Sequence, residues 1–261
     1  MVEGVIENIA ENTGGVVSKA YDDVVHPTAA AVGTMLSYPF RGIRVLCGKY
    51  EKWLINGEES LHIVGEAVHK KMEKVPPEKQ CVPDAYVAIP TIQQICLAQD
   101  SEDLREMYAN LLVSSMNTDT KHKVLPSYVN IIGQLSPDEA RLLRYMSEKV
   151  NIPALEVRAS LSEDKKEEFV TSKDCYVEIS DGIIEISDNL NSYIENLQRL
   201  KLIKLEKDRY LVNKTEEYNK LIQNFKDEAK KDSFLKDKYL SFQKEILKIT
   251  LFGIEFNMIC S

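Results

Sequence analysis

Apolar residues recur at helical spacing in the middle of the chain. The stretch "LREMYANLLVSSM", from Leu104 to Met116, carries them three or four positions apart, which places them on one face of a helix. Asp100 and Ser101 precede this stretch, and either side chain can cap its first turn. The pattern therefore predicts an amphipathic helix that buries its apolar face.

The following stretch, "LPSYVNIIGQLSPDEARLL", contains two helix starts. Pro126 suits the first turn of a short helix, because a residue there needs no backbone donor. Ser136 and Pro137 then provide an N-cap and a first-turn proline, and Glu139 completes a capping box. This boundary divides the chain into a helical domain over residues 1–134 and a second domain over residues 135–261.

Beyond Val150 the pattern changes from helices to a mixture of helix and strand. Runs of β-branched residues on either side of Asp181-Gly182 predict a hairpin. The stretch "DNLNSYIENLQRLKLIKLEKDRYLV" predicts a helix, then a strand, a polar turn over residues 206–208 and a second strand. A helix followed by a two-stranded ribbon is the order of a winged helix. "EILKITLFGIEFNMIC" predicts another strand and a closing helix capped by Thr250. The apolar residues Leu197, Leu200, Ile203, Leu251 and Phe256 are expected to pack together.

Upstream, glycines and prolines interrupt the helical pattern. We expect a helix within residues 2–24, a second from Thr28 with a kink at Pro39, and a short third helix over residues 58–74. "VPPEKQCVPDAYVAIP" has four prolines in sixteen residues and is expected to be extended or looped. The predicted fold class is therefore mainly α, with an N-terminal helical domain followed by an α+β winged-helix-like domain.

The composition is that of an ordinary globular protein of 261 residues, with 44% hydrophobic and 28% charged residues. The net charge is −8, and both halves of the chain are acidic, so attraction to DNA is expected to be weak. The 5 cysteines are widely spaced and form no CxxC pair, which predicts reduced thiols. The N-terminus lacks the basic start of a signal peptide, and no apolar run is long enough for a membrane span. We expect a cytoplasmic protein.

The pattern that most resembles a metal site is "EESLHIVGEAVH", which contains Glu59/His62 and Glu66/His69. ExxH is the ligand unit of carboxylate di-iron bundles, which need ligands from several helices. On one helix the two units lie roughly 10 Å apart, too far to share one metal centre. We therefore expect a solvated polar stripe that binds no metal and no cofactor.

A second candidate is a basic aromatic patch around Trp53. Its members are Arg41, Arg44, Lys49, Lys52 and Trp53. Such a patch could bind phosphate or lipid headgroups. An exposed helix face with Trp53 anchored in the core explains the same residues.

Three further features have ordinary structural explanations. Arg105 and Glu106 are neighbours in sequence and point in different directions on a helix, so structural salt bridges suit them better than a catalytic pair. Asn110, in an apolar helix, is expected to make a helix–helix contact. The helix over residues 190–200 exposes a nearly neutral face, unlike a groove-reading helix.

No nucleophile elbow, phosphate loop or zinc-protease motif is present, and lone His122 has no evident partner, so we favour a protein without a catalytic site.

Taken in series, several strings of this chain resemble the bacterial abortive infection alpha family. The strings are "VPPEKQCVP", "DSEDLREMYANLLVSSM", "LPSYVNIIGQLSPDEARLL", "YIENLQRLKLI" and "KITLFGIEFNMIC", and their order and spacing match from about His26 to Cys260. The chain departs from the family pattern in two places. Lys201 stands where the family commonly has glycine in a helix-to-strand turn, and Leu125 stands where a histidine often precedes the helix start.

The resemblance implies a bacterial protein associated with defence against phage, and it implies no reaction. Two hypotheses follow, beside the alternative of a metal-dependent enzyme. The protein senses or sequesters a phage or host component through a protein–protein contact, or it is a triggered toxic effector that contacts membrane or nucleic acid through the basic aromatic patch. We expect a protein partner and no DNA partner, and the sequence is compatible with a homo-oligomer.

Overall fold

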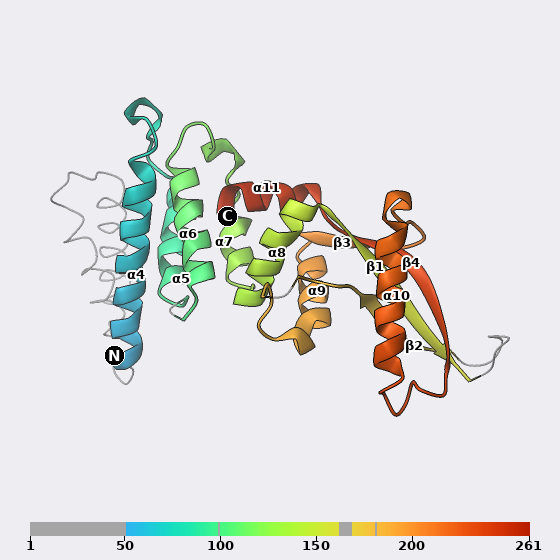
Figure 1. Ribbon diagram of the computed structural model, residues 1–261. Coiled ribbons are helices and arrows are strands. Elements are labelled where there is room, and N and C mark those ends of the chain that lie inside the picture. Colours follow the sequence, from blue (N-terminus) through green and yellow to red (C-terminus); the bar gives the residue numbers. More distant parts are fainter. Residues whose placement is uncertain (1–50, 99, 162–168, 181) are drawn as a thin grey trace, which may run out of the picture. The chain divides into compact units, whose positions relative to one another are not determined.

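The computed structural model describes residues 51–98, 100–161, 169–180 and 182–261, which form two compact units (Figure 1). Unit 1 contains the described residues up to Pro137 together with Met258–Ser261, and unit 2 contains Asp138–Asn257. The architecture is mixed, with many helices and one antiparallel sheet. The predictions for residues 2–24, for Thr28 and for Pro39 lie outside the described residues.

Unit 1 is built from helices. Its elements are α4 (Glu51–Met72), η1 (Pro77–Lys79), α5 (Ala85–Ile95), α6 (Glu102–Ser115), η2 (Lys121–Lys123) and α7 (Ser127–Ile132). The predicted amphipathic helix is confirmed as α6, and Ser101 caps it by accepting a hydrogen bond from the backbone N–H of Leu104 at 3.2 Å. The proline-rich stretch is looped only as far as Asp84, with η1 inside it, because α5 begins at Ala85 and includes Pro90.

The core of unit 1 lies where α4, α5 and α6 contact one another (Figure 1). From α6 it receives Met107, Tyr108 and Leu111, whose side chains are almost completely buried. Leu61 and Val64 contribute from α4. The helical spacing of the sequence therefore identified the buried face of α6 correctly, since residues three and four apart share one side of a helix.

Unit 2 combines helices with a four-stranded antiparallel sheet of order β2-β1-β4-β3. Its elements, starting one residue before the unit, are α8 (Pro137–Lys149), β1 (Asn151–Ser160), β2 (Phe169–Tyr176), η3 (Ser187–Asn189), α9 (Leu190–Arg199), β3 (Ile203–Glu206), η4 (Val212–Lys214), α10 (Thr215–Ala229), β4 (Tyr239–Ile249) and α11 (Leu251–Cys260). Helix α8 begins at Pro137, as the Ser136-Pro137 signal predicts.

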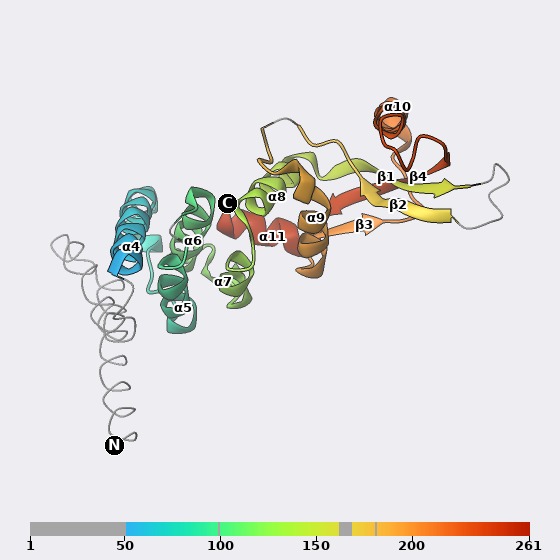
Figure 2. The same cartoon turned by 90° about the horizontal axis from the view of Figure 1, so that it is seen from below.

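The two faces of the sheet differ in what they bury. Leu155 and Val157 of β1 pack against Tyr218, Leu221 and Phe225 of α10, which lies over one face of the sheet (Figure 2). Successive side chains of a strand point to opposite faces, so the even-numbered residues of β1 lie on the other face.

The predicted hairpin at Asp181-Gly182 is wrong. Among the described residues from Val177 to Ile186 there is no strand, and Gly182 has a φ of 80°, a left-handed conformation that suits a turn. The strand before this segment, β2, pairs with β1 instead. Asp181-Gly182 between β-branched residues is only a local turn signal. The pairing of β2 depends instead on the long strand β1.

The predicted two-stranded wing after α9 is also wrong in its second strand. The first strand is β3, but it pairs with β4 through Leu205 and Leu247, and residues 209–211 form no strand. The backbone N–H of Leu211 donates to the hydroxyl of Tyr218, which in turn donates to the carbonyl of Glu245 at 2.7 Å. The Tyr218 hydroxyl therefore joins Leu211 to β4, and the segment after β3 leads through η4 into α10 instead of folding back as a strand.

The backbone conformation of Lys201, in the turn between α9 and β3, explains why glycine would suit this position. Lys201 has a φ of 62°, and the N–H of Leu202 donates to the carbonyl of Leu197 at 3.0 Å, which closes a Schellman motif. The Thr250 cap is confirmed, because its hydroxyl accepts from the N–H of Gly253 at 2.9 Å. The expected packing of Leu251 is wrong, since 80% of its surface is exposed.

Candidate functional site

The basic aromatic patch falls largely outside the described residues. This is true of Arg41, Arg44 and Lys49. Lys52 and Trp53 lie in the first turn of α4, where only the backbone is described. The patch therefore remains a prediction.

The Glu59/His62/Glu66/His69 stripe lies on the exposed side of α4. His62 Nδ1 lies 3.6 Å from a carboxylate oxygen of Glu66, and His69 pairs with Glu73 in the same way at 3.6 Å. These contacts run between residues four apart and so do not follow the ExxH spacing. Within the described ranges, no group of three or more His, Cys, Asp or Glu side chains is arranged to hold a metal ion.

Asn110 joins three segments of unit 1, as expected for an amide in an apolar helix. Its side-chain oxygen accepts from Lys71 of α4 at 2.6 Å, and its amide donates to the carbonyl of Cys260 at 3.3 Å. Glu106 forms an ion pair with the same lysine at 3.3 Å. Ser114, one turn further along α6, donates to the carbonyl of Ile259. These residues tie the C-terminus of the chain to α6, so their role is structural.

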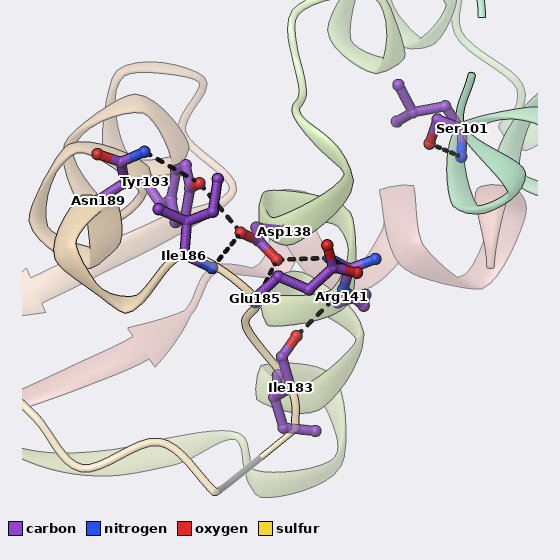
Figure 3. A network of polar contacts seen from close by, with 9 residues as sticks. Ser101, Asp138, Arg141, Ile183, Glu185, Ile186, Asn189 and Tyr193 are labelled. Carbon is purple, nitrogen blue, oxygen red and sulfur yellow. Dashed lines mark hydrogen bonds and ion pairs between the residues drawn. The ribbon is translucent and has the colours of Figure 1, made fainter. Parts of the chain in front are cut away.

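A polar network of unit 2 surrounds the buried carboxylate of Asp138 (Figure 3). It accepts from the backbone N–H groups of Glu185 and Ile186 at 2.8 and 3.1 Å and from the Tyr193 hydroxyl at 3.0 Å. Arg141 donates to it at 2.5 Å. Burial acts to raise the pKa of Asp138, but these hydrogen bonds outweigh it and hold the pKa below its ordinary value.

This network anchors the irregular segment before α9. Arg141 extends it by donating to the carbonyl of Ile183 at 3.2 Å and by pairing with the Glu185 carboxylate at 3.0 Å. A carboxylate whose oxygens already accept four donors has little capacity left to take a proton or a ligand. Asp138 therefore replaces strand pairing as the support of this segment, and we assign it no catalytic role.

Glu245 of β4 has the opposite environment. Its side chain is fully buried, and neither of its carboxylate oxygens has a hydrogen-bond partner. Burial raises its pKa to about 7, with Lys207 and Arg158 opposing the rise and Glu156 and Asp208 adding to it. The same face of the sheet carries Glu156, which accepts both hydrogen bonds of a fork from Arg158 at 2.9 Å. The sequence did not single out Glu245, because an isolated glutamate in a strand gives no signal of its burial.

A hollow of about 390 Å³ lies in unit 1 at the meeting of two connecting segments. We call it the Tyr86 hollow; it is lined by Cys81, Asp84, Tyr86, Thr118, Lys121, His122 and Val124. Backbone hydrogen bonds hold the segments together, from Cys81 to the carbonyl of Met116 and from Thr118 to the carbonyl of Lys79, both at 2.9 Å. The proline-rich string and the segment after α6 thus form one structure.

Polar contacts fix the shape of the Tyr86 hollow. Lys121 Nζ lies 2.9 Å from the Asp84 carboxylate and donates to the carbonyl of Val82 at 2.8 Å. The Tyr86 hydroxyl donates to the same carboxylate at 3.0 Å. The Lys121 hydrogen bond lowers the pKa of Asp84, and the Asp84 hydrogen bond raises the pKa of Tyr86.

The Tyr86 hollow brings a paired carboxylate and lysine together with a thiol and an imidazole. Asp84 and Lys121 neutralise one another, and the half-buried Cys81 thiol points to the carbonyl of Ser115 at 3.9 Å. His122, for which the sequence gave no partner, lines the same hollow as Cys81. A nucleophilic thiol needs a base or positive charge that lowers its pKa. Lys121, the lysine that lines this hollow, is already held by Asp84.

Comparison with known proteins gives one family and one solved structure. No curated protein matches the chain. A structure of the uncharacterized protein from the hydrocarbon-degrading marine bacterium Alcanivorax borkumensis SK2 is 18% identical, covering 54% of this chain and 94% of that chain, with a TM-score of 0.31. At that level the likeness carries no argument about fold or function.

In the described part of the chain, no helix is both long enough and apolar enough to cross a membrane. The model of the family named abortive infection alpha matches residues 57–260. That range includes all of unit 2 and much of unit 1, with the Tyr86 hollow and the Asp138 network. Because the match extends over most of the sequence, the chain belongs to the abortive infection alpha family.

Proposed function

We propose that this protein acts in phage defence by binding a protein partner at the Tyr86 hollow. Membership of the abortive infection alpha family suggests the defence role. The observation that supports a binding role is the group of apolar side chains exposed by the two segments that form the hollow. Val82 is 40% exposed, Tyr86 60% and Leu125 41%.

Such a surface has the composition of a protein contact. Interfaces are enriched in aromatic anchors, and the strongest contributions come from residues such as tyrosine that bury a ring and keep a polar group paired. Tyr86 meets this description, since its ring is exposed while its hydroxyl is held by Asp84. Because Asp84 and Lys121 already hold each other, a partner can cover them without leaving a buried charge alone.

The test is a matched pair of alanine variants in a strain where the wild-type chain lowers phage plaque formation. Tyr86→Ala should abolish protection while leaving the melting temperature within about 2 °C, because the ring is mostly exposed. Leu97→Ala is the control. This residue is 58% exposed in the same unit and does not line the hollow, so protection should persist.

A photo-reactive amino acid placed at position 86 or at position 97 tests whether a protein binds at the Tyr86 hollow. A cross-link to one protein from position 86 but not from position 97, during infection, is the expected result. Equal protection by wild type and Tyr86→Ala would contradict the proposal. Loss of anionic-liposome binding on changing Lys52 or Trp53, together with loss of protection, would favour the effector hypothesis instead.

We also infer that unit 2 is a winged-helix-like module with two insertions. In support of this, α8, β1, α9, β3 and β4 follow one another in the order of that fold, and β4 lies between β1 and β3. On this interpretation, β2 is one insertion, and α10 with its flanking residues occupies the wing.

The module is expected to bind no DNA. Arg199 of α9 is held by Asn196 through hydrogen bonds of 3.0 and 2.7 Å, and exposed Glu195 adds a negative charge nearby. The full-length protein should therefore fail to shift a random duplex in low salt, where phosphate contacts are strongest. Tight, salt-sensitive binding that is lost in Arg199→Ala would show that the module reads DNA.

A further inference from the structure

A second pocket lies wholly within unit 2 and is larger than the Tyr86 hollow. Its volume is about 500 Å³, within the size range of small-molecule sites. We call it the Lys149 pocket. Four segments line it: the end of α8, the start of β1, the residues after β2, and the end of η4 with the start of α10.

The Lys149 pocket concentrates positive charge in an acidic chain. It is lined by the three lysines Lys149, Lys214 and Lys220 and by two glutamates. The glutamates pair with two of the lysines, Lys214 with Glu217 at 3.0 Å and Lys220 with Glu178 at 2.9 Å. Three positive and two negative groups leave one excess positive charge, whereas the whole chain carries −8.

Lys149 carries that excess charge. The contact recorded for its ammonium within the described part of unit 2 is the ring of Tyr145, whose centroid lies 5.9 Å away. A cation over an aromatic ring is held in place, yet its hydrogens stay available to a ligand. Next to it, Ser180 donates to the hydroxyl of Tyr145 at 3.2 Å, and both residues line the pocket.

The backbone beside Lys149 is strained. Val150 has a φ of 60°, a conformation that β-branched residues rarely adopt, and its side chain is 42% exposed. Burial of the valine therefore does little to offset the strain. The left-handed residue turns the chain sharply between Lys149 and Asn151, and both of these residues line the pocket.

From this arrangement we infer that the Lys149 pocket binds a small organic anion that also carries hydroxyl or amino groups, such as a phosphate ester. The anionic group would be held by Lys149 and the Tyr145 hydroxyl. The carboxylates of Glu178 and Glu217, fixed by their lysines, would accept hydrogen bonds from the hydroxyl or amino groups. Inorganic phosphate should bind more weakly, since it can use only the contacts with Lys149 and the Tyr145 hydroxyl.

Calorimetric titration of the full-length protein with AMP, glucose 6-phosphate and inorganic phosphate tests this inference. At least one of the two esters should bind saturably and more tightly than phosphate. Lys149→Gln should weaken that binding by about tenfold, as expected for one charge-assisted contact. Lys230→Gln is the control, because this lysine is exposed at the other end of α10 and pairs with Asp227.

Two results would overturn the inference. Absence of saturable binding by both esters would overturn it, as would equal weakening in Lys149→Gln and Lys230→Gln, which indicates general attraction to positive charge. Circular dichroism of each variant checks that it is folded. A second variant, Lys220→Gln, should also weaken ester binding, so a failure of Lys149→Gln to fold would not leave the inference untested.

Discussion

Replacement of Glu245 by glutamine measures what it costs to bury a carboxylate without hydrogen-bond donors. The pKa of this carboxyl rises from 4.5 to about 7 in the folded protein. Each unit of pKa corresponds to about 1.4 kcal/mol, so the ionised form is disfavoured by about 3 kcal/mol. Glutamine has nearly the same shape and no charge, and it removes this penalty.

The sign of the pH dependence follows from proton binding. Between the unfolded and the folded pKa, the folded protein retains a proton that the unfolded chain releases, so its stability falls as pH rises. The loss is complete above the folded pKa of about 7. Wild type should therefore lose about 2 kcal/mol relative to Glu245→Gln between about pH 5.5 and pH 8.

Urea denaturation at several pH values provides the measurement. Far-UV circular dichroism should be used, because it follows the loss of the helices and the sheet of unit 2. Glu216→Gln, on the exposed surface of α10, is the control and should run parallel to wild type. Parallel curves for wild type and Glu245→Gln would refute the reasoning, because they would mean that the carboxyl is solvated or paired.

Three further substitutions test the structural assignments. Asp138→Ala should destabilise the protein by about 3 kcal/mol, because it leaves Arg141 and two backbone donors without their acceptor; an unchanged denaturation midpoint would contradict this. Lys201→Gly should raise the unfolding free energy by about 1 kcal/mol, since φ is 62° there, and a loss of stability would argue against the left-handed conformation. Gly253→Ala should cost at least about 2 kcal/mol, because its Cβ would lie 2.0 Å from the carbonyl oxygen of Leu202, and a fully stable variant would show that α11 sits farther away.

Local patterns determined the helices of this protein. The spacing of Leu104, Tyr108 and Leu111 placed α6, and the Ser136-Pro137 signal placed the start of α8. Caps and apolar periodicity involve residues within one or two turns, so a single sequence contains all the information needed. The resemblance to the abortive infection alpha family rests on the same local strings, and the family match confirms it.

Strand pairing was decided by contacts between distant residues. The sequence suggested a hairpin at Asp181-Gly182 and a wing after β3, but β1 pairs with β2 and β4, and β3 pairs with β4. A short β-branched segment can pair with any strand that offers a matching edge, so its partner depends on the whole sheet. After β3 the chain passes through η4 into α10, and the Tyr218 hydroxyl of that helix holds the backbone of Leu211.

The candidate sites depended on tertiary structure still more strongly. Lys149 and Lys220 are far apart in sequence, as are Tyr86 and Lys121, and no spacing rule connects them. The environments of Asp138 and Glu245 could not be foreseen either, because a carboxylate in the sequence gives no sign of the donors around it. The sequence by itself determined which segments are helical and which family they resemble; only the fold decided which charges meet, since burial and distance set their energy.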